Sequence, residues 1–169
     1  MDKKLSGSVS RRNLEPGSVK AVGVWFLARS TGRYLYLLRN DSKHPNSWGL
    51  PGGKIEGNET LLGGMERECI EELGRFPAYQ QMLPLEKFTS ADNVFEYYTW
   101  VCVVADEFVP VLNNEHHGYA WINRGTWPRN MHPGLWNTLN FDAIKEKISI
   151  YLESGDVPHL LFYGTAGTG

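Results

Sequence analysis

The segment "WGLPGGKIEGNETLLGGMERECIEELGR" (residues 48–75) combines a glycine-rich turn with an acidic stretch, and the rest of the chain is interpreted from it. The Pro-Gly-Gly turn presents backbone carbonyls and allows another group to approach closely. From Thr60 to Leu73 apolar residues recur at helical intervals, and Gly74 is a natural stop signal. The segment therefore predicts a tight turn followed by an amphipathic helix.

The predicted helix carries a concentration of carboxylates. Glu68, Glu71 and Glu72 stand at positions i, i+3 and i+4, so they share one face. Like charges at these spacings destabilise an isolated helix by about 0.2–0.5 kcal/mol per pair. A solvated acidic face is the ordinary explanation, but the nearby turn offers additional oxygen ligands. Carboxylates, carbonyls and substrate phosphates together suit Mg²⁺, so the segment predicts a divalent-cation site.

Further elements lie on both sides of this segment. Upstream, "VKAVGVWFLA" (19–28) and "YLYLLR" (34–39) predict a hairpin. Downstream, the pattern predicts a long strand at 95–105, a short strand at 119–123 and a helix at 132–154. Strands, helix, strands and helix in this order predict an α/β (α+β) fold, an α/β/α sandwich around a mixed sheet.

Length and charge are those of one globular domain. The chain has 169 residues, and its 19 acidic and 17 basic residues leave a net charge of −2. This near-balance argues against a general nucleic-acid or membrane-surface binder. No apolar run approaches the length of a membrane span, and the first residues lack the apolar stretch of a secretory signal, so a cytoplasmic protein is expected.

The expected domain organisation has three parts. Residues 1–17 are polar and predict a flexible lead-in, residues 18–154 form the domain, and residues 155–169 form a separate tail. The two cysteines, Cys69 and Cys102, are too few for a disulfide framework and are expected to be buried thiols.

The turn and helix together resemble the signature of the Nudix hydrolases. That signature is Gly, five residues, Glu, seven residues, then Arg-Glu-apolar-any-Glu-Glu-any-Gly-apolar. The chain supplies, in this register, Gly53, Glu59, Arg67, Glu68, Cys69, Glu71, Glu72 and Gly74. The last apolar position holds Arg75, with Phe76 following, so a shifted packing contact and intact chemistry are expected.

The resemblance implies a Nudix-type fold over about residues 20–154. It also implies hydrolysis of the pyrophosphate bond in a nucleoside diphosphate linked to another moiety, with Mg²⁺ as cofactor and Mn²⁺ as a substitute. Water would attack at phosphorus. The metal would be held by Glu71, Glu72 and the backbone carbonyl of Gly52 or Gly53.

Other signature residues have implied roles as well. Glu68 is a further metal ligand or the general base, and Arg67 orients it through a paired hydrogen bond. Glu59 supports the metal cluster from the loop. Gly53 and Gly74 complete the motif.

Candidates outside the signature come from a strand end and a loop. Glu115, in "NNEHHGYAWI" (113–122), is a candidate metal ligand or base, because many Nudix enzymes supply one from such a loop. Arg39 and His116 are candidate phosphate contacts. Trp48 and Trp121 flank the expected site and are candidate contacts for a base or sugar, although tryptophans more often belong to the core.

The tail, "GDVPHLLFYGTAGTG" (155–169), resembles the strand and phosphate loop of clamp-loader-type ATPases. Gly164 and Gly169 match the two glycines of the phosphate-loop pattern G-x-x-x-x-G-K-S/T. The Lys that contacts phosphates and the Ser or Thr that binds Mg²⁺ do not follow. The tail is therefore expected to bind no nucleotide.

Several functions and substrates stay open at this point. A GDP-mannose-type glycosyl hydrolase of the same superfamily would attack at carbon, and a non-catalytic module would sense a nucleotide sugar. The intact signature favours the enzyme that attacks phosphorus. Its substrate would be a nucleotide sugar, ADP-ribose, a dinucleoside polyphosphate or a nucleoside triphosphate. No membrane partner is expected, capped RNA is the one nucleic acid left open, and a homodimer is compatible with the sequence.

Overall fold

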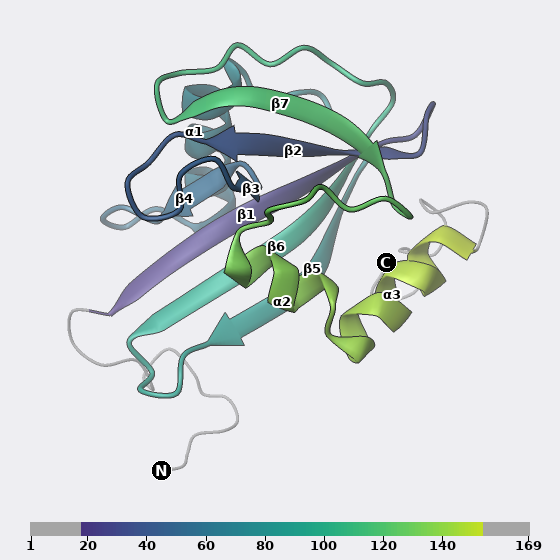
Figure 1. Cartoon of the computed structure of the whole chain (residues 1–169). Coiled ribbons are helices and arrows are strands. Elements are labelled where there is room, and N and C mark those ends of the chain that lie inside the picture. Colours follow the sequence, from purple (N-terminus) through teal and green to yellow (C-terminus); the bar gives the residue numbers. More distant parts are fainter. Residues whose placement is uncertain (1–17, 154–169) are drawn as a thin grey trace.

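The computed structural model describes residues 18–153 and contains a seven-stranded mixed sheet with helices on both faces (Figure 1). The strands are β1 (Val19–Ala28), β2 (Arg33–Arg39), β3 (Trp48–Gly49), β4 (Gly52–Lys54), β5 (Gln81–Thr89), β6 (Phe95–Val104) and β7 (His116–Asn123). The helices are α1 (Leu61–Leu73), α2 (Pro133–Leu139) and α3 (Asp142–Glu153). The strand order is β3-β2-β1-β6-β5, with β4 paired to β1 and β7 paired to β2. The predicted fold class is confirmed, whereas the predicted lead-in and tail lie outside the described residues.

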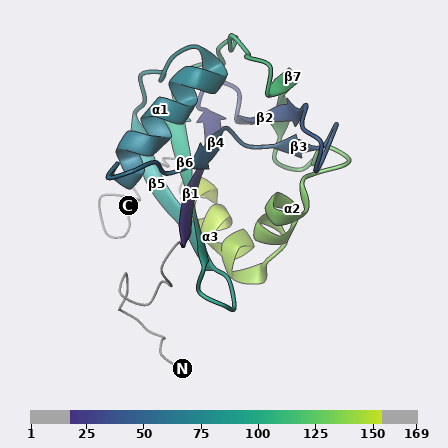
Figure 2. The ribbon, with the colours of Figure 1, turned by 90° about the vertical axis from the view of Figure 1, so that its left-hand side faces the viewer.

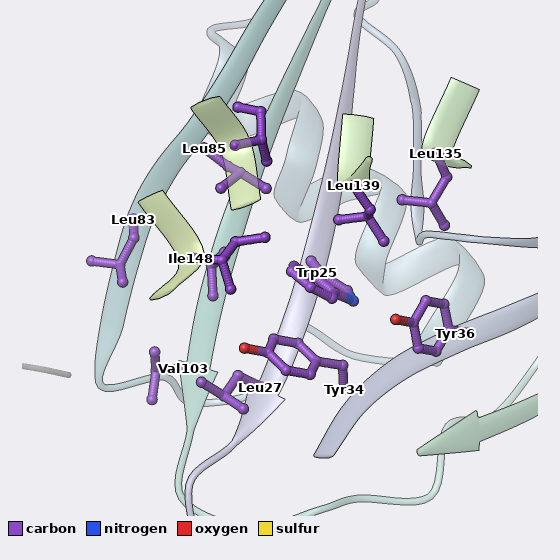
Figure 3. Packing of buried hydrophobic residues seen from close by; sticks show 12 residues of the cluster. Trp25, Leu27, Tyr34, Tyr36, Leu83, Leu85, Val103, Leu135, Leu139 and Ile148 are labelled. Carbon is purple, nitrogen blue, oxygen red and sulfur yellow. The ribbon is translucent and has the colours of Figure 1, made fainter. Parts of the chain in front are cut away.

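The two faces of the sheet carry separate cores, with α1 on one side and α2 and α3 on the other (Figure 2). Alternate residues of a strand point to opposite faces, which assigns the residues of β1 to the two cores. Val24 and Phe26 pack in the cluster that contains Met65 and Cys69 of α1. Trp25 packs in the other cluster, against Tyr34, Leu139 and Ile148, as Figure 3 shows. Both cysteines are buried free thiols, as expected.

The pairing of β1 places the glycine-rich turn in front of α1. One edge of β1 pairs with β6 in parallel along its whole length. The other edge pairs with β2 only at Leu27 and Ala28, and with β4 at Ala21 to Gly23. Gly23 is opposite Gly52 in this ladder, so two residues without side chains meet where α1 passes over the sheet.

Both ends of α1 are where the sequence predicts them. The Thr60 hydroxyl caps the first turn by accepting a hydrogen bond from the Gly63 N–H at 2.9 Å. Gly74 ends the helix in the left-handed conformation with φ of 85°. Phe76 packs against the α1-side core, which is the shifted contact expected beside Arg75.

Several elements differ from the predictions, and β3 and β4 are two strands in the segment where only a turn was predicted. Strand β5 was not predicted, because Pro84 and the charged residues of "QMLPLEKFT" hide its alternation. The single helix predicted at 132–154 is wrong: α2 and α3 are separated at Asn140 and Phe141. Asn favours helix ends over helix interiors. Strand β7 begins at His116 instead of 119, since it pairs with β2 as far as Arg39.

Within residues 18–153, no helix is both long and apolar enough to cross a membrane.

Candidate active site

Two buried carboxylates of α1 face the backbone of the glycine-rich turn. Glu72 is 2% exposed, and its Oε1 accepts a hydrogen bond from the Gly52 N–H at 3.0 Å. Glu68 is 8% exposed and lies directly against Gly53, where a Cβ would overlap its Oε2. A glycine is therefore required at position 53 for Glu68 to approach the turn.

The surroundings of these carboxylates disfavour negative charge. Burial is the main cause that raises the pKa of Glu68, and the charges of Glu71 and Glu115 raise it further against the opposing effect of Arg67. Burial likewise raises the pKa of Glu72, opposed by the Gly52 hydrogen bond and reinforced by the charges of Glu68 and Glu115. Such a group of carboxylates is stabilised when a cation neutralises it.

Arg67 ties the helix to the turn. Its Nε donates to Glu59 Oε2 at 2.6 Å, and its Nη2 donates to Glu59 Oε1 at 3.1 Å and to the Lys54 carbonyl at 2.9 Å. Its Nη1 donates to Glu68 Oε2 at 3.3 Å and to Glu71 Oε2 at 3.2 Å. The paired bond to Glu59 thus fixes the guanidinium, which in turn holds the Glu68 carboxylate in place.

Glu59 supports the site through Arg67. Both of its carboxylate oxygens bond to Arg67, and one also accepts the Glu56 N–H at 2.8 Å. The Arg67 hydrogen bond is the largest cause that lowers the pKa of Glu59. Its carboxylate therefore remains charged and engaged in the loop.

Glu71 and Glu115 lie nearer the solvent. The Glu71 side chain is 47% exposed and pairs with Arg67, while its backbone carbonyl accepts a hydrogen bond from the Asn113 side chain. Glu115 is exposed, and its backbone carbonyl accepts the Asn40 N–H at 2.9 Å. The charge of Glu115 contributes to the raised pKa values of Glu68 and Glu72.

A divalent cation fits this set of donors. Across residues 18–153, no three His, Cys, Asp or Glu side chains already converge as a finished metal centre. Glu68 and Glu72 nevertheless present buried oxygens with few compensating donors, and Glu71 and Glu115 can add two more carboxylates. Hard oxygen ligands of this type are those that Mg²⁺ and Mn²⁺ take.

A second group of polar side chains surrounds Arg39 at the end of β2. Arg39 forms an ion pair with Asp41, and its Nε is buried with no hydrogen-bond partner among the described residues. Burial, and then the Arg39 charge, lower the pKa values of His116 and His132 to about 4. Arg39 is therefore a cation beside two neutral imidazoles, and Asp41 balances part of its charge.

The structure adds one residue that sequence reasoning missed. The Tyr97 hydroxyl occupies the space beside Gly23, where a Cβ would overlap it. Burial raises the pKa of Tyr97 to about 12, and the nearby charge of Glu72 raises it while that of Arg39 lowers it. An isolated glycine inside the apolar run of β1 was the available signal, since such a residue marks close approach by another group.

The two candidate tryptophans lie in different cores. The Trp121 indole N–H donates to the Phe108 carbonyl at 3.0 Å, and its ring packs edge-on against Phe108 beside the α1-side core. Trp48 is partly buried against the opposite core, and its backbone bonds to Asn130 and His132. Trp121 therefore has a packing role in this structure.

Comparisons with known proteins identify the family. The sequence model of the NUDIX domain matches residues 17–139. A nucleoside triphosphatase NudI from Escherichia coli is 31% identical over 109 residues, covering 57% of this chain and 77% of that protein. A nucleoside triphosphatase NudI from Shigella sonnei is 30% identical over 109 residues, with the same coverage.

Solved structures of the family share the fold. A Nudix hydrolase from M. smegmatis, RenU, matches with a TM-score of 0.59 at 18% identity, over 78% of this chain and 86% of that chain. The NUDIX domain of Shewanella oneidensis NrtR, complexed with ADP ribose, matches with a TM-score of 0.58 at 14% identity, over 82% and 92%. These identities show the fold alone. Since the sequence match spans most of the chain and includes the whole signature of α1, the chain belongs to the NUDIX domain family and is a pyrophosphohydrolase.

Proposed function

We propose that this protein is a divalent-metal-dependent hydrolase that cleaves the pyrophosphate bond of a nucleoside triphosphate, with water attacking at phosphorus. The observation that carries this proposal is the buried pair Glu68 and Glu72 against the glycine turn, with Arg67 fixing Glu68. The sequence relatives with 30–31% identity are named nucleoside triphosphatases, which favours this substrate class. ADP-ribose is the second candidate, because a structural neighbour binds it.

The proposed roles follow from position and charge. Glu68, Glu71, Glu72 and Glu115 would hold Mg²⁺ or Mn²⁺ with the Gly52 backbone carbonyl. The cation would neutralise the charge of the phosphates and make a water more acidic. Glu68 would accept a proton from the attacking water, since its carboxylate is buried and oriented by Arg67. Arg39, beside two neutral histidines, would bind the phosphate chain.

A turnover assay tests this proposal. Nucleoside triphosphates, ADP-ribose, a dinucleoside polyphosphate, GDP-mannose and capped RNA would be incubated with Mg²⁺ or Mn²⁺ in ¹⁸O-water. We expect a nucleoside monophosphate and pyrophosphate from the triphosphate, with the label on phosphorus. Label on a released sugar would instead establish the GDP-mannose-type reaction. Binding without turnover of any of these compounds would indicate the sensing module.

Stability should depend on pH in the absence of metal. Because the folded protein raises the pKa values of Glu68 and Glu72, it retains protons that the unfolded chain releases above about pH 4.5. Stability should therefore fall as pH rises from about 5 towards 8 in EDTA. At pH 8, millimolar Mg²⁺ or Mn²⁺ should raise the melting temperature by several degrees, because a ligand that binds only the folded state stabilises it.

The matched variant for this experiment is Glu72→Gln, which has a similar size and can keep the Gly52 hydrogen bond without the charge. In EDTA at pH 8 it should melt above the wild type and gain less from metal. A wild-type midpoint that responds to neither pH nor metal would contradict the proposed cation site.

A further inference from the structure

A pocket of about 340 Å³ opens between the segment that follows β7 and the helices α2 and α3. The residues that line it are Arg124, Gly125, Trp127, Leu139, Lys145 and Ile148. Its volume lies in the range of pockets that hold small organic molecules. None of these residues belongs to the Nudix signature or to the group around Arg39.

The pocket lies at the end of β7 that is remote from the candidate active site. Strand β7 begins at His116, which pairs with Arg39 of β2. The pocket begins after the other end of the strand, since Arg124 directly follows Asn123. A strand of this length spans roughly 20 Å. In Figure 1 the arrowhead of β7 likewise lies near α3, far from α1. The pocket is therefore separate from the carboxylates of α1.

The inner wall of the pocket is apolar and continuous with the core that α2 and α3 cover. Leu139 and Ile148 are buried members of this core. Trp127 is only partly buried, and its ring lies 6.2 Å from the ring of fully buried Trp25. An apolar ligand in the pocket would shield these side chains from water, which is favourable in proportion to the area covered.

Two cationic side chains line the same pocket. The Arg124 Nη2 donates a hydrogen bond of 2.8 Å to the Ser149 hydroxyl, which fixes the guanidinium against α3. Lys145 lies four residues before Ser149, so both project from one face of that helix. Within residues 18–153, neither cation forms an ion pair with a carboxylate. No acidic residue lines the pocket, so its charge is left for a ligand to balance.

The lining side chains can donate hydrogen bonds but cannot accept them. Arginine, lysine and tryptophan carry only N–H donors, and the other lining side chains are apolar or absent. A sugar hydroxyl or the N–H of a base would find no side-chain acceptor here, and a buried donor without a partner is costly. A carboxylate, by contrast, accepts from both cations.

We propose that this pocket is a second binding site, for a small organic carboxylate with a hydrocarbon body. The carboxylate accepts hydrogen bonds from Arg124 and Lys145, and the body lies against Trp127, Leu139 and Ile148. The inference goes beyond the proposed function and does not depend on it, because no residue of the pocket takes part in the hydrolysis. A gap that only holds water would have no preference for an anion, and this difference can be measured.

A titration followed by NMR tests the site. The probe is 2-naphthoate, and its neutral counterpart is 2-naphthamide, which has the same body without the charge. The readout is the Trp127 indole N–H signal of the full chain, identified by its absence in Trp127→Phe. We expect 2-naphthoate to shift this signal saturably and to bind at least roughly tenfold more tightly than 2-naphthamide, since charge-assisted hydrogen bonds are worth about this factor.

Two methionine variants remove one charge each while keeping an apolar side chain of similar length. Arg124→Met and Lys145→Met should each weaken binding of 2-naphthoate by roughly tenfold and leave binding of 2-naphthamide unchanged. Lys145 is exposed, so its variant keeps the test valid if Arg124→Met fails to fold. The matched control is Lys147→Met on the same helix. Lys147 donates to the Leu85 carbonyl and does not line the pocket, so its variant should bind as the wild type does.

Four outcomes would overturn the proposal. The first is equal affinity for 2-naphthoate and 2-naphthamide, and the second is wild-type affinity in either folded methionine variant. The third is a wild-type Trp127 signal that does not respond, the result expected if another part of the chain or a second copy fills the pocket. The fourth is an equally strong response to AMP, which would assign the pocket to nucleotides. Hydrolytic activity bears on none of these outcomes, so the pocket and the proposed function can fail independently.

Discussion

Glu68→Gln is expected to lower turnover by roughly 10²–10⁴-fold, the range that a positioned general base contributes. The substitution keeps the size of the side chain and much of its hydrogen-bonding reach, but it removes the charge and the basicity. Substrate affinity should change much less, because Glu72 and the Arg39 group remain. The measurement is kcat and KM for a hydrolysed nucleoside triphosphate at saturating Mg²⁺.

Glu66→Gln is the control for this experiment. Glu66 lies on the same helix but is exposed and outside the signature, so its variant should retain wild-type kinetics. If the acidic helix were only a solvated face, the two variants would be equally active. Equal activity would therefore refute the assignment of Glu68.

Arg67→Lys should reduce kcat by about 10²-fold, the cost of a small displacement of a reacting group. A lysine keeps the positive charge but cannot make the paired bond to Glu59 while also bonding to Lys54 and Glu68. The Glu68 carboxylate would then be held less firmly against Gly53. We expect kcat to fall more than KM rises, because the binding surface for the substrate is untouched.

Arg75→Lys provides the comparison. Arg75 follows the same helix and is exposed, and its guanidinium lies over the Phe108 ring at 5.4 Å. Among the described residues, no hydrogen bond or ion pair joins Arg75 to Glu68. Its variant should behave as the wild type. A pH profile adds a second readout: in Arg67→Lys, loss of the guanidinium hydrogen bond that stabilises ionised Glu68 should move the acidic limb of the profile to higher pH. An Arg67→Lys enzyme with normal kcat and an unchanged profile would show that Glu68 is positioned by other groups.

The sequence predicts the parts of the site that depend on local spacing. Helical periodicity places Glu68, Glu71 and Glu72 on one face of α1, and its two ends follow from Thr60 and Gly74. The spacing of the eight matching positions from Gly53 to Gly74 identifies the signature. These features could be predicted because short-range geometry of the backbone determines them.

Features that depend on packing were predicted less well. Strand β5 exists because β6 offers it an edge, and its Pro84 and charged residues gave little sign of a strand. The break between α2 and α3 interrupts a pattern that is apolar at helical intervals on both sides. Pairing with the next strand decides the first outcome, and the preference of Asn140 for a helix end opposes the apolar pattern in the second.

What the sequence alone determined is the family, the helix that carries the signature, and the identity of its carboxylates and arginine, because these are fixed by spacing along one element. Only the tertiary structure decided which carboxylates are buried. Glu68 packs against Gly53 and Glu72 accepts a hydrogen bond from Gly52, so both are shielded from solvent, whereas Glu71 stays exposed. It also decided that Tyr97, more than 70 residues from Gly23, fills the space beside that glycine. Burial and the electric field at a site are sums over neighbours from the whole chain, and a linear pattern does not contain them.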